Sequence, residues 1–92
     1  MRSLDKMRQD IDQLDDQILS LIAKRFKVVE EVGKYKKQND MPPLQPGRWQ
    51  QVVAKIRAKA NKLNLNPNMI EQIWNIIHKQ AQAEEQQVID ED

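Results

Sequence analysis

Cysteine is absent from this 92-residue chain, as are a long apolar run and a large net charge of either sign. The lack of cysteine excludes disulfides and thiolate metal sites, and it favours a cytoplasmic location. No apolar run approaches the roughly 20 residues of a membrane span, and the first residues lack the apolar region of a signal peptide. With 15 Lys+Arg against 14 Asp+Glu, the net charge is +1. We therefore expect neither nucleic acid nor a membrane as a partner.

Glycine and aromatic residues are also scarce, with two glycines, two tryptophans, one tyrosine and one phenylalanine. Together with the shortage of alternating β-branched stretches, this argues against strands and predicts an all-α fold. The length suits one small domain over residues 1–92. Apolar periodicity predicts three helices, one long and two shorter, over about residues 4–38, 46–63 and 67–88.

Capping residues support these boundaries. Ser3 is a suitable N-cap for the first helix, and the sequence at 39–43 ends it with two prolines. Pro46 suits the first position of the second helix, and Asn66 suits the N-cap of the third. We expect residues 89–92 to fray.

Two cations interrupt the apolar stripe of the long helix. At about 100° per residue, Arg25 and Lys36 point into the same sector of roughly 120° as the apolar side chains. A buried cation is costly unless an anion meets it, so a buried anion is one interpretation. The alternative is that each cation reaches solvent or pairs with a glutamate. The stripe consists of Leu4, Met7, Ile11, Leu14, Ile18, Leu21, Ile22, Val28, Val29 and Val32.

The predicted long helix is too long for a compact body. About 35 residues span about 52 Å, whereas a chain of this size folds into a body about 32 Å across. The overhanging apolar stripe predicts an intertwined homodimer in which two long helices pack together. Arg8 lies about 25 Å along the axis from Arg25, so it would complete the partner's site. The alternatives are an open coiled coil and, for Arg8, an ordinary solvated arginine.

Other polar residues also fall on or beside apolar faces. Arg48 lies in the first turn of the second helix, where free N–H groups near Gly47 favour anions. Glu85 lies on the apolar face of the third helix, where a desolvated carboxyl group would tend to keep its proton. Alternatively, Glu85 pairs with a lysine or is exposed. His78 lies at the edge of the same face and reads as a packed or surface histidine.

Most forms of catalytic chemistry have no candidate residues here. We find no nucleophile with a base, no glycine-rich phosphate loop and no metal-ligand spacing, and we expect no metal or cofactor. Several cations and one acid around an apolar pocket suit a small substrate with two or more carboxylates. They also suit a reaction that needs orientation and charge stabilisation rather than covalent catalysis.

Three segments carry a resemblance to a known family. Residues 7–15, MRQDIDQLD, resemble the start of the all-helical chorismate mutases. Similar matches are LIAKR at 21–25 with VGKYK at 32–36, and LQPGR at 44–48. The resemblance covers roughly residues 4–86. It implies an intertwined dimer of three-helix chains that converts chorismate to prephenate in phenylalanine and tyrosine biosynthesis, on the shikimate pathway.

The resemblance also implies roles for individual residues. Arg25 would bind one substrate carboxylate, and Arg8 of the partner chain would bind the other. Lys36 would donate to the ether oxygen that gains negative charge as the C–O bond breaks, and Glu85, when protonated, would donate to the same oxygen. Arg48 would orient a carboxylate. Val32 would contact the ring.

Two positions depart from the family pattern. Trp49 stands where many members carry a glutamate that accepts a hydrogen bond from the ring hydroxyl, so Gln45 or a backbone carbonyl would have to replace it. Ala81 stands where a serine that touches a carboxylate is frequent. Both departures leave the efficiency and the substrate open.

Three alternatives to a mutase remain. A related branch uses the same scaffold as an isochorismate pyruvate lyase. A non-catalytic helical interaction module is a second alternative. A nucleic-acid binder using Lys24, Lys27, Lys34 and Lys37 is the third, and the near-zero net charge disfavours it.

Overall fold

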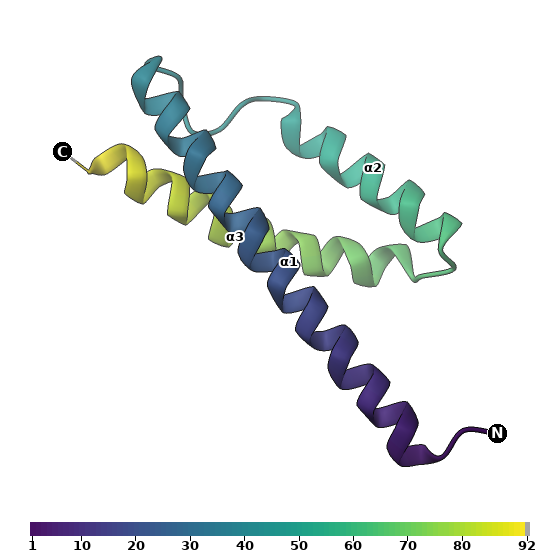
Figure 1. Cartoon of the computed structure of the whole chain (residues 1–92). Coiled ribbons are helices and arrows are strands. Elements are labelled where there is room, and N and C mark those ends of the chain that lie inside the picture. Colours follow the sequence, from purple (N-terminus) through teal and green to yellow (C-terminus); the bar gives the residue numbers. More distant parts are fainter. Residues whose placement is uncertain (92) are drawn as a thin grey trace.

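The computed structural model describes residues 1–91 and consists of three α-helices (Figure 1). These are α1 (Leu4–Gln38), α2 (Arg48–Lys62) and α3 (Pro67–Asp90). The helix α3 packs against both other helices, and α1 and α2 do not pack directly on each other. The all-α prediction is confirmed for the described residues, which contain no strand.

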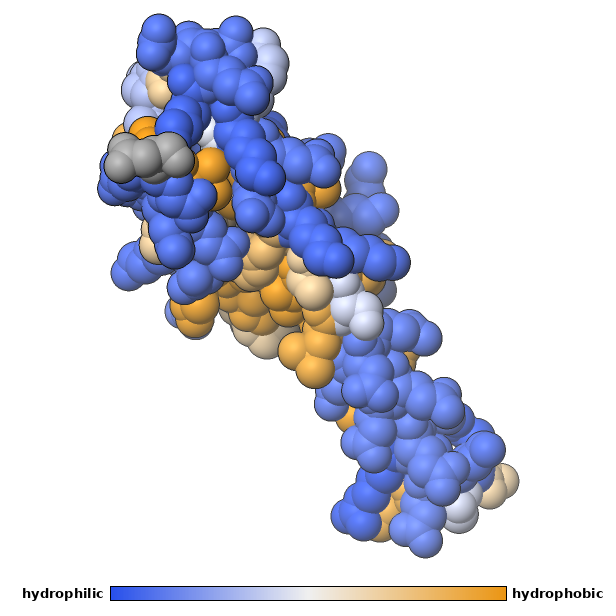
Figure 2. Space-filling view, turned by 60° about the vertical axis from the view of Figure 1, so that its left-hand side comes forward, coloured by the Kyte–Doolittle hydropathy of each residue, from blue (hydrophilic) through white to orange (hydrophobic). Residues whose placement is uncertain are grey.

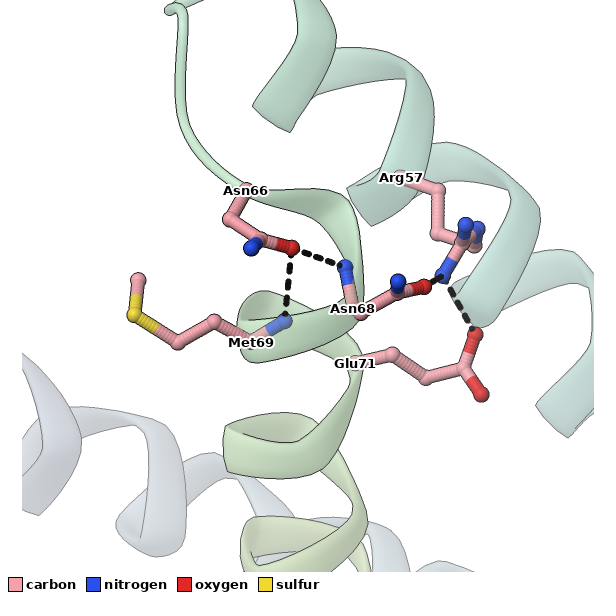
Figure 3. Close-up of polar contacts among 5 residues, drawn as sticks. All are labelled: Arg57, Asn66, Asn68, Met69 and Glu71. Atoms are coloured by element: carbon pink, nitrogen blue, oxygen red, sulfur yellow. Dashed lines mark hydrogen bonds and ion pairs between the residues drawn. The ribbon is translucent and has the colours of Figure 1, made fainter.

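Side-chain caps start the first and third helices as expected. The Ser3 hydroxyl accepts a hydrogen bond from the N–H of Lys6 at 3.2 Å. The Asn66 amide oxygen accepts from the N–H groups of Asn68 and Met69 at 2.9 and 3.3 Å (Figure 3). Each cap satisfies backbone donors that have no partner within the helix.

A guanidinium group joins α2 to the start of α3. Arg57 donates through the same nitrogen, Nη1, to Asn68 Oδ1 and to Glu71 Oε1, both at 3.1 Å (Figure 3). This cluster lies next to the capped turn between the two helices and adds polar contacts between α2 and the start of α3.

The second helix begins later than predicted. We expected Pro46 at its first position, but α2 begins at Arg48 and Gly47 is the N-cap. Gly47 has φ 85°, a left-handed conformation that glycine adopts without steric cost. A turn over residues 46–47 therefore replaces the first helical turn, and the Arg48 N–H donates to Gln45 O at 3.2 Å. The Arg48 N–H is therefore engaged, whereas the N–H groups of Trp49 and Gln50 in the first turn have no backbone partner in the described part of the chain.

Helices α1 and α2 end in the same backbone motif. At the end of α1, Met41 N–H donates to Lys36 O at 2.9 Å and Asp40 has φ 52°. At the end of α2, Leu65 N–H donates to Ala60 O at 2.8 Å and Asn64 has φ 59°. These are Schellman motifs, in which a left-handed residue reverses the chain and satisfies the last carbonyls.

The third helix is longer than predicted. We expected residues 89–92 to fray, but α3 continues to Asp90. Val88 is buried, and Lys37 Nζ donates to its carbonyl oxygen at 3.4 Å. These contacts with α1 hold the last turn in place. Residue 92 lies outside the described residues.

The first half of α1 projects beyond the other helices as an uncovered arm (Figures 1 and 2). The chain measures 57 × 27 × 15 Å, and its radius of gyration of 16.8 Å exceeds the roughly 12 Å of a compact chain this long. Apolar side chains on the arm are more than half exposed, among them Leu4, Ile11, Leu14, Ile18 and Leu21. The predicted overhang is thus present.

A small core holds α3 against its neighbours. Its buried side chains are Ala60, Ile77, Ala81 and Val88. Gly33 is the buried residue of α1, and a Cβ atom built there would lie 3.3 Å from both Glu85 Cα and Val88 Cβ. The absence of a side chain at Gly33 therefore lets α1 and α3 approach closely at this point. None of the helices in residues 1–91 is long and apolar enough to cross a membrane.

Candidate active site

A cavity of about 150 Å³ lies where one face of α1 meets one face of α3. The α1 residues that line it are spaced i, i+4, i+7 and i+11, and those of α3 are spaced i, i+3, i+4 and i+7. Both spacings place side chains on a single face of a helix. The lining residues are Arg25, Val29, Val32 and Lys36 on α1, and His78, Ala81, Gln82 and Glu85 on α3.

The start of α2 and the segment before it complete the cavity. The Schellman motif that closes onto the Lys36 carbonyl reverses the chain, which brings residues 43–45 back over the end of α1. The first turns of α2 then supply Arg48, Trp49 and Val52. All three helices therefore contribute walls to one cavity, which is open to solvent at Arg48.

The ammonium group of Lys36 is held between two oxygens. Lys36 Nζ lies 2.7 Å from Glu85 Oε1 and 2.6 Å from the carbonyl oxygen of Pro43. Both charged side chains are only 12% exposed. Pairing with a lysine was one of the alternatives for Glu85, and here the two polar groups satisfy each other while also joining α1 to α3.

Arg25 carries a buried donor with no acceptor. Its Nη1 atom is buried and makes no hydrogen bond within residues 1–91. Leaving such a donor unsatisfied costs about 1–3 kcal/mol, and more for a charged group. An anion entering the cavity would provide the missing acceptor. Neither alternative that we considered for this cation, contact with solvent or pairing with a glutamate, accounts for the buried nitrogen.

Trp49 and His78 form a stacked pair in the cavity wall. Their ring centroids are 4.0 Å apart and the rings are inclined by only 14°. Burial lowers the pKa of His78 from its ordinary value of 6.5; the Glu85 carboxylate opposes this shift, and the Arg25 guanidinium adds to it. The neutral imidazole, which has one donor and one acceptor nitrogen, is thus favoured at neutral pH.

Two further predicted residues differ in how they are held. Gln45 is half-buried, and its amide nitrogen donates to Pro42 O at 2.9 Å, which leaves its amide oxygen available. Arg48 is exposed at the rim of the cavity. Its position suits a residue that meets a ligand from the solvent side.

The structure brings together all the predicted site residues except Arg8. Arg8 is exposed on the arm of α1, 17 residues before Arg25, and does not line the cavity. We did not assign His78 to the site from the sequence, although its spacing to Ala81 and Glu85 already placed it on their face. Other lining residues that we did not predict are Val29, Pro43, Leu44, Val52 and Gln82.

A second hollow, of about 300 Å³, lies on another face of α1 and is a poorer site for an anion. Three carboxylates line it, from Glu30, Glu84 and Glu91, with Lys27 as its one cation. The smaller cavity instead holds three cations, Arg25, Lys36 and Arg48, against the single carboxylate of Glu85. That excess of two positive charges suits a dianion.

Within residues 1–91 no group of His, Asp or Glu side chains is arranged to hold a metal ion. The residues that line the cavity can bind carboxylates, form hydrogen bonds and exclude water. These functions suit a unimolecular rearrangement, in which orientation and charge stabilisation lower the barrier.

Comparisons with known proteins agree with this chemistry. Residues 7–86 match the family model described as chorismate mutase type II. The chain is 32% identical over 87 residues to the T-protein of Haemophilus influenzae, covering 95% of this chain but only 23% of that protein. It is 29% identical over 91 residues to the chorismate mutase of Methanocaldococcus jannaschii, covering 99% of this chain and 92% of that protein.

A third relative is named for a different substrate. The 4-amino-4-deoxychorismate mutase of Streptomyces venezuelae is 24% identical over 74 residues, covering 80% of this chain and 72% of that protein. The family match spans nearly the whole of the three-helix fold and includes every residue lining the cavity. This chain belongs to the chorismate mutase type II family.

Proposed function

We propose that this chain converts chorismate to prephenate in the cavity between its three helices. The observation that carries the proposal is the buried guanidinium nitrogen of Arg25, which has no partner in a cavity whose lining bears an excess of cations. Chorismate has two carboxylates and an ether oxygen, and these match the donors that the cavity offers. In the reaction one C–O bond breaks and one C–C bond forms within the same molecule, so no group enters or leaves.

Arg25 and Lys36 would divide the work of binding and catalysis. Arg25 binds a carboxylate and holds the flexible side arm over the ring, which removes entropy from the barrier. Lys36 donates to the ether oxygen, where negative charge grows as the C–O bond breaks, and so stabilises the transition state more than the substrate. Removing such a donor costs about 3–4 kcal/mol in comparable sites.

Glu85 would act beside Lys36 on the same oxygen. In the structure Glu85 accepts a hydrogen bond from Lys36, so it must carry a proton in the substrate complex to donate to the ether oxygen. The amide of Glu85→Gln always offers a donor, so this variant should keep much of the wild-type kcat, whereas Glu85→Ala should lose most of it. Equal losses of kcat in the two variants would show that Glu85 does not donate to the substrate.

The site would be completed by a second copy of the chain. The apolar stripe on the arm of α1 is uncovered, and Arg8 projects from that arm, too far away to reach the cavity of its own chain. In an intertwined homodimer the stripe is buried against the partner, and Arg8 enters the partner's cavity to bind the second carboxylate.

Two related compounds are alternative candidates for the substrate. Isochorismate would be the substrate if the chain were a pyruvate lyase, and nothing in the cavity lining separates the two ring isomers. The Streptomyces relative is named for 4-amino-4-deoxychorismate, whose amino group would be charged at neutral pH. An ammonium group would meet the cations Arg25, Lys36 and Arg48, so we expect chorismate to be preferred over the amino compound.

The experiment is a turnover assay with each substrate supplied separately. With chorismate we expect loss of substrate and formation of prephenate, and with isochorismate no salicylate or pyruvate. Glu31→Gln changes an exposed residue of α1 outside the cavity and serves as the matched control for Glu85→Gln. Salicylate formation would favour the lyase, and no turnover of either compound would contradict an enzymatic role.

A further inference from the structure

We infer that His78, held flat against Trp49, accepts the hydrogen bond from the ring hydroxyl of the substrate. The inference deepens the proposed function and rests on it. In this role His78, which the sequence alone indicated as packed or exposed, determines specificity. Trp49 orients its ring in the cavity wall.

The geometry of the pair supports an accepting role. With ring centroids 4.0 Å apart and nearly parallel planes, Trp49 fixes the plane of the imidazole and restricts its rotation. His78 lines the same cavity as the groups assigned to the carboxylates and the ether oxygen. Its ring nitrogens make no hydrogen bond to any group in the described part of the chain, so both remain available to a ligand.

Of the other side-chain and carbonyl acceptors in the cavity lining, two are engaged, and the amides of Gln45 and Gln82 are not held by a stacked ring. Pro43 O accepts from Lys36 at 2.6 Å, and Glu85 Oε1 accepts from the same ammonium group at 2.7 Å. Gln45 keeps a free amide oxygen, but it lies on the segment before α2 and is held by one hydrogen bond to Pro42. His78 is the acceptor whose orientation a packed side chain fixes.

The charges around His78 favour the accepting form of the ring. Arg25 and Lys36 on α1 and Arg48 on α2 line the cavity with it, and Glu85 is the only carboxylate there. Burial, together with the Arg25 guanidinium, lowers the pKa of His78 against the opposing effect of Glu85. At neutral pH one ring nitrogen therefore has a free lone pair for a hydroxyl donor.

The test compares chorismate with an analogue in which hydrogen replaces the ring hydroxyl. The wild-type chain should prefer chorismate by about three- to tenfold in kcat/KM, the range for one neutral hydrogen bond. His78→Phe keeps the stack on Trp49 but removes both nitrogens, so this preference should vanish. His78→Gln restores an acceptor and should recover part of it. Gln45→Ala is the matched control and should retain the preference.

The pH profile provides a readout that a purely structural role would not move. As the pH falls through the lowered pKa of His78, the ring gains a proton and loses its acceptor, so kcat/KM for chorismate should fall in the wild type relative to His78→Phe.

The outcomes separate the inference from the proposed function. If the wild type converts chorismate but His78→Phe keeps the full hydroxyl preference, or Gln45→Ala loses it instead, the assignment to His78 is overturned and the mutase function stands. If the wild type converts no chorismate, the proposed function fails and the inference fails with it.

Discussion

The burial of Arg25 is unfavourable for the stability of the free protein. A buried guanidinium nitrogen without an acceptor lowers the stability of the free protein, whereas a substrate carboxylate would satisfy it. The same nitrogen therefore lowers the stability of the empty protein and strengthens the binding of a carboxylate. This combination is typical of a binding residue rather than of a structural one.

The first prediction separates the two roles of Arg25. Arg25→Met keeps an apolar stem of similar length and removes the unsatisfied donor, so the free energy of unfolding should stay equal or rise by about 1–3 kcal/mol. Turnover should fall at least about 100-fold, because charge-assisted hydrogen bonds to a carboxylate are lost. Thermal unfolding and the chorismate assay on the same preparation measure both. A large loss of stability would show that Arg25 is structural.

The second prediction concerns the pH dependence of stability at His78. The folded state lowers the pKa of His78, so the unfolded chain binds this proton more tightly. The stabilisation is therefore fully present above about pH 6.5 and is lost as the pH falls through the lowered pKa. Melting temperatures between pH 8 and pH 5 should fall more steeply in the wild type than in His78→Phe. Parallel curves would contradict a half-buried ring that is held neutral in the folded state.

At the level of single residues the sequence predicted much of the cavity. Arg25, Lys36 and Glu85 were conspicuous because each is a charge on an apolar face, and that signal is independent of tertiary structure. His78 was missed because its role depends on Trp49, which lies on another helix. Stacking between residues 29 positions apart has no signature in helical periodicity.

The helix boundaries were predictable only where local side chains mark them. The starts of α1 and α3 were predictable because Ser3 and Asn66 cap with their own side chains. The start of α2 was not, because Gly47 caps through a left-handed backbone that leaves no side-chain signal. The two extra residues of α3 depend on contacts of Val88 with α1, which only the folded chain provides.

The third prediction concerns the crossing of α1 and α3 at Gly33. In Gly33→Ala the added Cβ atom would lie 3.3 Å from the backbone of Glu85, so α3 must move by a few tenths of an ångström. Higher helix propensity, worth up to about 1 kcal/mol, offsets this crowding. We expect a near-unchanged melting temperature but a severalfold lower kcat, because the Lys36–Glu85 pair is displaced.

A larger side chain and a matched control sharpen the test at this crossing. Gly33→Leu should destabilise by several kcal/mol, since no flexible neighbour can yield. Lys34→Ala changes the adjacent, exposed position of α1 and should leave kcat unchanged. Full activity in Gly33→Leu would mean that the close helix crossing does not position Glu85.

The whole molecule is extended because its longest element has no partner over half its length. With an overall length of 57 Å and exposed leucines and isoleucines along the arm, the single chain leaves apolar surface in water. The sequence predicted this overhang from helix length alone. It could not reveal which surface covers the arm, because that depends on the geometry of a second chain.

The fourth prediction uses two inactive variants to test a shared site. Arg8→Ala and Arg25→Ala should each be inactive alone, because each damages both sites of a homodimer. After mixing and refolding, heterodimers should contain one site with both arginines intact. About a quarter of the wild-type activity should return, since half of the dimers are mixed and each has one working site. No recovery would contradict the contribution of Arg8 across the interface.

The most direct measurement is calorimetric titration of the protein with a bicyclic dicarboxylate that mimics the transition state of the rearrangement. We expect one bound molecule per chain, and at least a 100-fold weaker Kd in Arg25→Met. Binding of equal strength to the wild type and to Arg25→Met, or no binding to either, would contradict the claim that the Arg25 guanidinium binds a carboxylate of the ligand in the cavity.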